Sequence, residues 1–315
     1  MSAMDGVIVI DKPGGLSSSA VVLKVKGIVG ARKAGHAGTL DPIATGVLPL
    51  CINEGTKLVP FFMHCEKEYI ATLRLGIETD TQDREGAVIR QTETIPADHA
   101  EIVRVFKEFQ GAVLQTPPMF SALKHHGVPL YRMARRGEDV PRQPRSITIY
   151  RIAVLSFDLP FITFSVQCSS GTYVRTLCAD IGSRLQCGAH LVELKRVRNG
   201  AFHINRALPL EELKAEARNG SLGKLIIPLS QALPELPAIV VTQQLGNKVS
   251  HGMLCTVSDI AGTSLPNFTA GEKVKLVTAE GTLLAVVESC VDSGALPAAG
   301  AQQPVWKILR NFQVQ

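Results

Sequence analysis

The sequence predicts an α+β fold with two domains, and three observations support this expectation. The chain has 315 residues, whereas a typical domain has about 100–200 residues. Strand-like and helix-like segments follow one another without the regular strand–helix–strand rhythm of a doubly wound α/β protein. After a proline-rich stretch, the last part of the chain contains mainly short strand-like segments of a small β module.

Strand-like and helix-like segments are mixed in the first part of the chain. Residues 7–10 form a run of valine and isoleucine typical of a buried strand, which the turn sequence DKPGG ends. Serines 17–19 then offer N-caps for a helix that runs to about residue 29. Periodicity and composition give the remaining elements: strands at 47–52, 69–75, 146–157 and 161–166, helices at 100–110 and 176–185, and loops at 35–46 and 79–86.

The proline-rich stretch 228–237 is the expected linker between the domains. Short strands separated by turn residues follow it, at 254–257, 273–278 and 283–287. We therefore expect a first domain over residues 1–236 and a second, mostly β domain over residues 237–315.

The composition is that of a globular protein, with 45% hydrophobic and 19% charged residues. It excludes a disordered chain, a collagen-like chain and a coiled coil. Seven cysteines without C-x-x-C spacing indicate neither a disulfide framework nor a zinc ribbon. The N-terminus lacks a basic segment, and the apolar runs are far shorter than the ~20 residues that span a bilayer. A cytoplasmic protein without membrane contact is expected.

The mild net charge of +5 hides an uneven distribution. Residues 66–101 hold 4 basic and 9 acidic residues, whereas residues 102–206 hold 15 basic and 6 acidic residues. Residues 236–315 hold 5 of each. The middle of the chain is therefore the part best suited to an anionic partner.

One loop stands out chemically: residues 35–48, with the sequence GHAGTLDPIATGVL. Its glycines allow sharp turns and a close approach of the backbone to a ligand. Asp41 precedes Pro42, which disfavours the helical conformation and places the carboxylate between a turn and an apolar strand. By itself, an Asp-Pro pair is equally explained as ordinary turn chemistry.

This loop resembles the motif of the bacterial tRNA pseudouridine-55 synthases, the TruB family. Five further blocks resemble that family in the same order. They are residues 11–18 (DKPGGLSS), 67–71 (KEYIA), 79–83 (TDTQD), 115–124 (QTPPMFSALK) and 171–177 (GTYVRTL). Ser17 and Phe120 depart from the threonine and tyrosine that are common in the family. The resemblance implies a mixed-sheet pseudouridine-synthase domain with an inserted thumb-like element, followed by a small PUA-like domain.

The implied reaction cuts the C–N glycosidic bond of one tRNA uridine, turns the uracil and rejoins it through carbon 5. By resemblance, Asp41 is the catalytic carboxylate and Arg175 is its cationic partner. A carboxylate can stabilise or trap the oxocarbenium-like sugar, as in retaining glycosidases, or remove a proton from the ribose. Both routes require an ionised Asp41, so we expect a nearby cation to lower its pKa. Outside the motif, Arg175 would be read as a surface salt bridge.

The resemblance also assigns substrate contacts to His36, Tyr69, Tyr173 and Leu194, and a supporting role beside the catalytic loop to Lys12. Tyr69 would stack on a uracil that has left its helix, because base chemistry requires an extruded base. Three of these residues could instead have a purely structural role. Tyr69 suits a strand that faces the core, His36 suits a structural position, and the spacing around Leu194 equally fits a core helix.

The expected partner is tRNA, and the basic segment 124–145 is its expected binding surface. In the family this region resembles a thumb over the T stem-loop, and the C-terminal module would contact the acceptor end. Lys195, Arg196 and Arg198 form a second candidate patch. The histidines show no metal-ligand spacing, so neither a metal nor another cofactor is expected. We expect a monomer that works without a guide RNA.

Three other functions remain open on the sequence. A non-catalytic RNA-binding protein could reuse this scaffold, although it would not need Asp41, Tyr69 and Arg175 together. A glycoside hydrolase needs two acidic residues beside the sugar, and the loop offers one. A guide-RNA-dependent relative is disfavoured, because residues 39–46 look closer to the stand-alone bacterial form.

Overall fold

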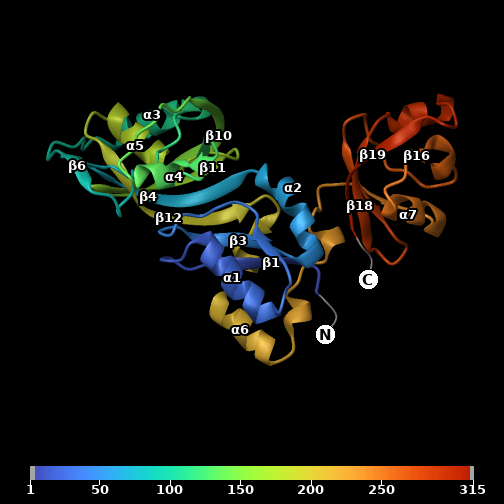
Figure 1. Ribbon diagram of the computed structural model, residues 1–315. Coiled ribbons are helices and arrows are strands. Elements are labelled where there is room, and N and C mark those ends of the chain that lie inside the picture. Colours follow the sequence, from blue (N-terminus) through green and yellow to red (C-terminus); the bar gives the residue numbers. More distant parts are fainter. Residues whose placement is uncertain (1–3, 313–315) are drawn as a thin grey trace.

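The computed structural model describes residues 4–312 and contains one large and one small β-sheet (Figure 1). Ten strands form the large sheet, whose main order is β14-β1-β3-β12-β4-β11-β10-β7, with β2 paired to β3 and β13 to β12. The strands are β1 (Gly6–Lys12), β2 (Ala34–His36), β3 (Thr45–Ile52), β4 (Lys67–Leu75), β7 (Gly111–Gln115), β10 (Arg145–Asp158), β11 (Phe161–Cys168), β12 (Ala189–Asn199), β13 (Phe202–His203) and β14 (Leu208–Pro209). The small sheet has the order β15-β17-β18-β19-β16 and consists of β15 (Ala238–Val240), β16 (Cys255–Thr256), β17 (Lys273–Val277), β18 (Leu283–Ser289) and β19 (Pro304–Asn311).

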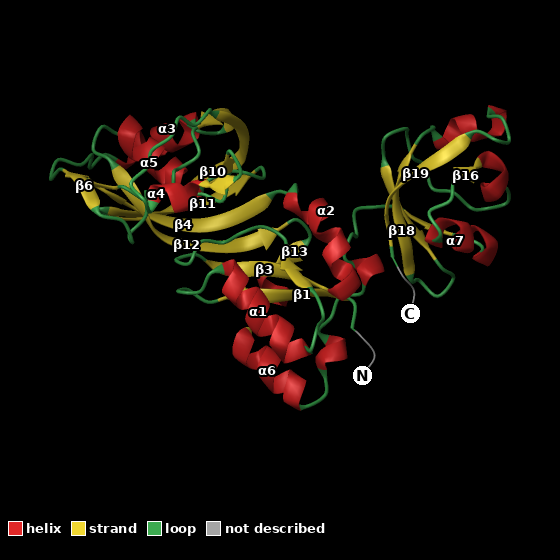
Figure 2. Cartoon of the chain, in the orientation of Figure 1, coloured by secondary structure: helices red, strands yellow, loops and turns green. Residues whose placement is uncertain are grey.

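Helices cover the large sheet in two groups, which Figure 2 shows at its two ends. One group contains α1 (Ser18–Val29) and α6 (Leu210–Arg218) beside β1 and β3, and the other contains α3 (His99–Glu108) and α5 (Val174–Arg184) near β10 and β11. Buried residues from all four helices belong to one apolar cluster with the large sheet. The remaining helices are α2 (Val59–Met63), α4 (Leu130–Ala134) and α7 (Gln243–Ser250).

Local sequence explains the ends of the elements near the centre of the large sheet. The Ser17 side chain accepts a hydrogen bond from the Ala20 amide and caps α1, and Gly30 ends that helix in the left-handed conformation with φ of 64°. In β1, Ile8 and Ile10 face the helix-covered cluster, whereas Val7 and Val9 face a second cluster on the other side of the strand. This alternation is the two-residue period of a strand buried on both faces.

Two insertions between strands of the large sheet form separate two-stranded hairpins. The hairpin of β5 (Ile77–Thr79) and β6 (Val88–Gln91) follows β4, and its loop carries the 79–83 block. Between β7 and β10 lies a segment with the short hairpin of β8 (Lys124–His125) and β9 (Val128–Pro129), followed by α4. This second insertion occupies the position expected for the thumb-like element.

The small sheet packs against the large domain through an apolar cluster. Val9 and Val47 of the large sheet share this cluster with Val277 and Val286 of the small sheet. Ala232 and Leu233, from the proline-rich stretch between the sheets, are buried in the same cluster. Lys57 adds a hydrogen bond of 3.0 Å to the carbonyl of Asn311.

Candidate active site

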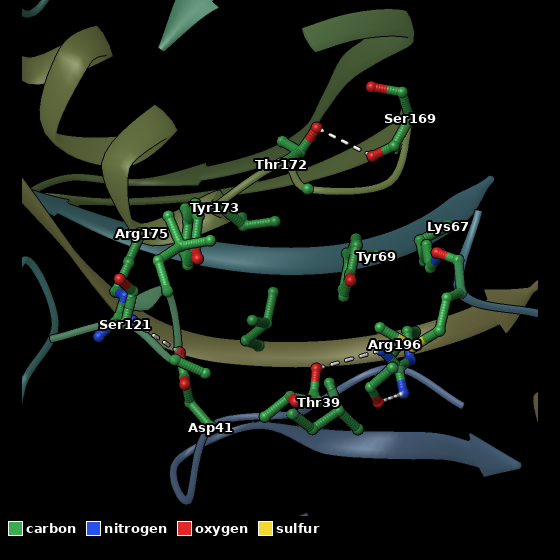
Figure 3. A pocket seen from close by; sticks show the side chains of 18 residues that line it. Thr39, Asp41, Lys67, Tyr69, Ser121, Ser169, Thr172, Tyr173, Arg175 and Arg196 are labelled. Carbon is green, nitrogen blue, oxygen red and sulfur yellow. Dashed lines mark hydrogen bonds and ion pairs between the residues drawn. The ribbon is translucent and has the colours of Figure 1, made fainter. Parts of the chain in front are cut away.

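A cavity of about 290 Å³ lies over β4 and β12, at the centre of the large sheet (Figure 3). Five of the seven candidate site residues line it, namely Asp41, Tyr69, Tyr173, Arg175 and Leu194. Asp41 is the only acidic side chain among the described residues that form the lining. The structure therefore brings a single carboxylate to the same cavity as the two tyrosines.

Backbone and side-chain hydrogen bonds fix the loop that carries Asp41. The Ser18 hydroxyl lies 2.8 Å from the amide and 2.9 Å from the carbonyl oxygen of Leu40, immediately before Asp41. After it, the carbonyl of Pro42 accepts bonds from the Gly15 amide at 2.9 Å and from Lys12 Nζ at 3.3 Å. The carboxylate is thus presented from a loop whose backbone is held on both sides.

Arg175 is shared between two carboxylates. Its guanidinium lies 3.5 Å from an oxygen of Asp41 and 3.7 Å from an oxygen of Asp83, and it also donates to the carbonyl of Phe120. The Arg175 side chain is 6% exposed. Asp83 is buried and accepts further hydrogen bonds from the Thr81 hydroxyl at 2.7 Å and the Glu85 amide at 3.0 Å. Asp83 therefore helps to orient the arginine that faces Asp41.

The expectation of a lowered pKa for Asp41 is wrong for the free protein. Burial raises the pKa of Asp41 above its ordinary value, and the neighbouring Asp83 carboxylate raises it further. Arg175 and Lys12 oppose this effect but do not outweigh the loss of solvation. The cation thus limits a rise in the pKa instead of causing a net decrease.

The two tyrosines come from different elements and meet at the cavity. Tyr69 projects from β4 and is 8% exposed, and its burial raises the pKa of the hydroxyl, so the phenol is neutral at physiological pH. Tyr173 precedes α5, where its amide donates to Gln115 Oε1 at 2.8 Å and its carbonyl accepts from Gln115 Nε2 at 3.1 Å. The Arg175 guanidinium lies 5.8 Å from the centre of the Tyr173 ring.

Leu194 lies on a strand, so the helical reading of its surroundings is wrong. It belongs to β12 and pairs with Ala71 of β4. The second candidate RNA patch is also corrected. Arg196 is 1% exposed, and Arg198 pairs with Glu66 and Glu68, which leaves Lys195 as the exposed member of this group.

His36 and Lys12 do not line the cavity. His36 lies on β2, where burial lowers its pKa and its Nδ1 has no hydrogen-bond partner. Lys12 ends β1 with no exposed surface, and its ammonium donates to the carbonyls of Pro13 at 3.0 Å and Pro42 at 3.3 Å. Burial lowers the pKa of Lys12 to about 8.

Sequence reasoning missed four residues that the site brings together. Lys67, Ser121 and Arg196 line the cavity, and Asp83 lies behind Arg175. Lys67 donates to the carbonyls of Met63 and Cys65, and burial lowers its pKa to about 8. Lys67, Ser121 and Asp83 all lie in blocks recognised from the sequence, so membership of a block was their only available signal.

The basic insertion begins at the cavity. Ser121, Ala122 and Leu123 line the cavity, and the predicted basic segment 124–145 follows immediately. Within this segment, the Arg135 guanidinium lies 5.6 Å from the centre of the Tyr131 ring. The positive charge of the middle of the chain is thus continuous with one wall of the site.

Residues 4–312 contain neither a metal-ligand cluster nor a membrane-spanning helix. No cluster of three or more His, Cys, Asp or Glu side chains there has the arrangement of a metal site. In the same residues, no helix is long and apolar enough to cross a bilayer.

Comparison with known proteins supplies the family. Residues 26–174 match the model of the TruB family pseudouridylate synthase N-terminal domain, and residues 175–234 match the tRNA pseudouridylate synthase B C-terminal domain. The tRNA pseudouridine synthase B of Syntrophus aciditrophicus is 42% identical over 98% of this chain and 99% of its own length. The chain belongs to the TruB family. This TruB-family enzyme is an isomerase that makes pseudouridine 55 in tRNA.

Other relatives agree with this assignment. The tRNA pseudouridine synthase B of Geobacter sulfurreducens is 46% identical to this TruB-family chain over 91% of the chain and 94% of its own length. A solved Cbf5-Nop10-Gar1 complex contains a chain that is 28% identical, with a TM-score of 0.75, over 98% of this chain and 85% of that chain. The expected fold class, a mixed-sheet synthase domain followed by a small β domain of PUA type, is confirmed.

Proposed function

We propose that Asp41 is the catalytic residue of pseudouridine formation. The observation that carries this proposal is that Asp41 is the single carboxylate lining the cavity among the described residues, 3.5 Å from the buried Arg175 guanidinium. Cleavage of the glycosidic bond builds positive charge on the sugar, and the ionised carboxylate either bonds to it or removes a ribose proton. Arg175 and Lys12 favour the ionised form of Asp41 against burial, and Lys12 also holds the loop through Pro42.

Four residues are proposed to contact the target uridine. Tyr69 stacks on the extruded uracil, which compensates for part of the few kcal/mol that extrusion costs. Tyr173 and Leu194 complete the walls around the nucleotide, since both line the cavity with Tyr69. His36 contacts RNA from outside the cavity through the part of its half-buried ring that reaches the surface, since its Nδ1 is enclosed by the protein.

The substrate element is proposed to be the T stem-loop of tRNA, held by the basic segment 124–145 that begins at the cavity wall. The C-terminal β domain contacts the acceptor end as a supporting surface, because residues 236–315 carry equal numbers of basic and acidic residues. The chain acts as a cytoplasmic monomer without a cofactor or guide RNA. Its identity is 42–46% to proteins named tRNA pseudouridine synthase B, against 26–28% to chains of a Cbf5 complex and an H/ACA RNP, which supports the guide-free reading.

The test uses purified protein and two unmodified transcripts, a whole tRNA and its isolated T stem-loop. Without guide RNA or added cofactor, both should be converted at the uridine equivalent to position 55, and the stem-loop should bind more weakly because it lacks the acceptor end. Conversion that requires a guide RNA would contradict the proposal, as would a stem-loop that is never converted. Equal affinity for the two transcripts would remove the role of the C-terminal domain.

A further inference from the structure

Arg196 occupies the position where the catalytic loop and the Tyr69 strand meet. On one side of β12 it pairs with Tyr69 of β4, and on the other side it pairs with Gly46 at the start of β3. Directly paired residues of neighbouring strands project from the same face of a sheet. The Arg196 side chain therefore lies on the cavity face, between the aromatic residue and the loop that carries Asp41.

The Arg196 guanidinium binds both ends of that loop. It donates to the carbonyl of Gly38 at 3.0 Å and lies 3.4 Å from that of Thr39, both before Asp41 (Figure 3). Its Nε donates to the carbonyl of Val47 at 2.8 Å, after Asp41. Its planar, multiply donating head can bridge several acceptors in fixed directions, which a lysine ammonium on a flexible stem does less well.

A buried, unpaired arginine is an unfavourable choice if its role is only to stabilise the fold. Arg196 is 1% exposed and forms no ion pair with any carboxylate among residues 4–312. Burial of a cation without a counter-ion is unfavourable, and the three carbonyl contacts offset this desolvation only in part. Asn199, three residues further along β12, donates a hydrogen bond of 2.6 Å to the carbonyl of Ala37.

Gly46 shows how closely the loop approaches β12. A Cβ atom at this position would lie 2.2 Å from the carbonyl oxygen of Arg196, and the φ angle of Gly46 is +97°. Only glycine accommodates both conditions without strain. The C-terminal end of the loop thus packs against the backbone of Arg196, and the side chain of the same residue binds the N-terminal end of the loop.

We infer that Arg196 is a positioning residue that fixes the Asp41 loop relative to Tyr69 by bridging the carbonyls of Gly38, Thr39 and Val47. This inference rests on the catalytic role proposed for Asp41. Arg196 acts through the loop and not on the reacting atoms, so its removal should slow the chemical step more than it weakens tRNA binding. A misplacement of about 1 Å in a catalytic group can cost about 100-fold in rate.

The test compares Arg196→Lys with wild type by single-turnover pseudouridine formation at saturating enzyme and by equilibrium binding of tRNA. Lysine retains the charge but cannot bridge both ends of the loop. The rate should fall about 100-fold, whereas the Kd for tRNA should change by less than about threefold. A folded Arg196→Lys enzyme with a rate within about threefold of wild type would overturn the inference.

Two accompanying variants separate positioning from general stability. Asn199→Ala removes the contact to Ala37 only and should lower the rate about tenfold, which is a milder form of the same loss. If Arg196→Lys does not fold, an unchanged rate in Asn199→Ala overturns the inference. Lys275→Met is the matched control, because this buried cation of the C-terminal domain donates to the carbonyls of Ser230 and Leu233 in the proline-rich linker. None of the three residues lines the cavity, so the removal of Lys275 should leave the single-turnover rate unchanged.

If Lys275→Met slows the reaction as much as Arg196→Lys does, lost stability explains both variants and the inference fails. Asp41→Asn is measured in parallel. An active Asp41→Asn enzyme would refute the proposed function itself, whereas an inactive Asp41→Asn beside a fully active Arg196→Lys would refute only the positioning role.

Discussion

Replacing Arg175 by methionine should destabilise the protein strongly at neutral pH. Arg175 lies 3.5 Å from Asp41 and 3.7 Å from Asp83. Two unit charges at such distances attract by about 5 kcal/mol at an effective dielectric constant of about 20. Desolvation cancels part of that attraction, and removal of one partner of a buried pair typically costs about 3–5 kcal/mol. We expect about 3 kcal/mol, because Asp83 keeps its bonds to Thr81 and Glu85.

Urea unfolding of wild type, Arg175→Met and Arg175→Met/Asp83→Asn measures this effect. The double variant should recover part of the loss, because it removes the carboxylate left buried without a cation. Arg184→Met is the matched control on the same helix. Arg184 lies closer to its partner, 2.7 Å from Glu108, but its side chain is 57% exposed, so its loss should cost less than about 1 kcal/mol.

If Arg175→Met and Arg184→Met lower the free energy of unfolding equally, burial does not decide how much an ion pair contributes to stability. If the double variant is no more stable than Arg175→Met, the unpaired Asp83 carboxylate does not cause the loss of stability.

Three further predictions concern the pocket and the RNA. The free energy of unfolding of wild type, relative to that of Lys12→Met, should increase as the pH rises from about 8 to 10.5, by at most about 3 kcal/mol. The reason is that Lys12 loses its proton at a lower pH in the folded state than in the unfolded state. Urea unfolding of both proteins at pH 7 and 10 measures the difference. Tyr69→Phe should retain the affinity for tRNA, whereas Tyr69→Ala should weaken it by about 1–3 kcal/mol through lost stacking, and equal affinities of the two variants in filter binding would count against a stacking role. The Kd for tRNA should rise steeply with salt, and Arg132→Gln should reduce the salt slope by about 1; a slope identical to that of wild type would remove Arg132 from the phosphate contacts.

The sequence predicts most of the fold because its local signals agree with the packing. The run of residues 7–10 became part of β1, and the serines after it became the cap of α1, since each segment carries its own periodicity and termination signals. Five of the seven candidate site residues line one cavity, although they come from distant parts of the chain, whereas His36 and Lys12 lie outside it. Four of the five lie in blocks of the resemblance, and Leu194 lies outside these blocks. Periodicity alone does not predict that these residues meet.

The strand β12 shows where sequence reasoning failed. Its pairing with β4 shifts register between Leu191 and Glu193 and again between Arg196 and Arg198. Each shift breaks the two-residue alternation of a strand, so apolar residues recur at helical spacing and Leu194 looked helical. Arg196 looked like part of a second RNA-binding patch, because its acceptors are backbone carbonyls of a loop about 150 residues away. Because every residue type has a backbone carbonyl, the sequence does not show which carbonyls a buried arginine will contact.

The direction of the Asp41 pKa shift was also beyond the sequence. The presence of Arg175 suggests a lowered value, but the balance depends on how much solvent the cavity excludes and on the second carboxylate that shares the arginine. Both quantities are properties of the assembled site.

The most direct test of the central claim is the single-turnover rate of Asp41→Asn on unmodified tRNA, measured with its affinity for that tRNA. Asp180→Asn is the matched control, since burial also raises the pKa of Asp180, to about 6, but this residue lies on α5 outside the cavity lining. We predict that Asp41→Asn binds tRNA and forms no pseudouridine, whereas Asp180→Asn turns over at the wild-type rate. Turnover by Asp41→Asn at a normal rate would contradict the account.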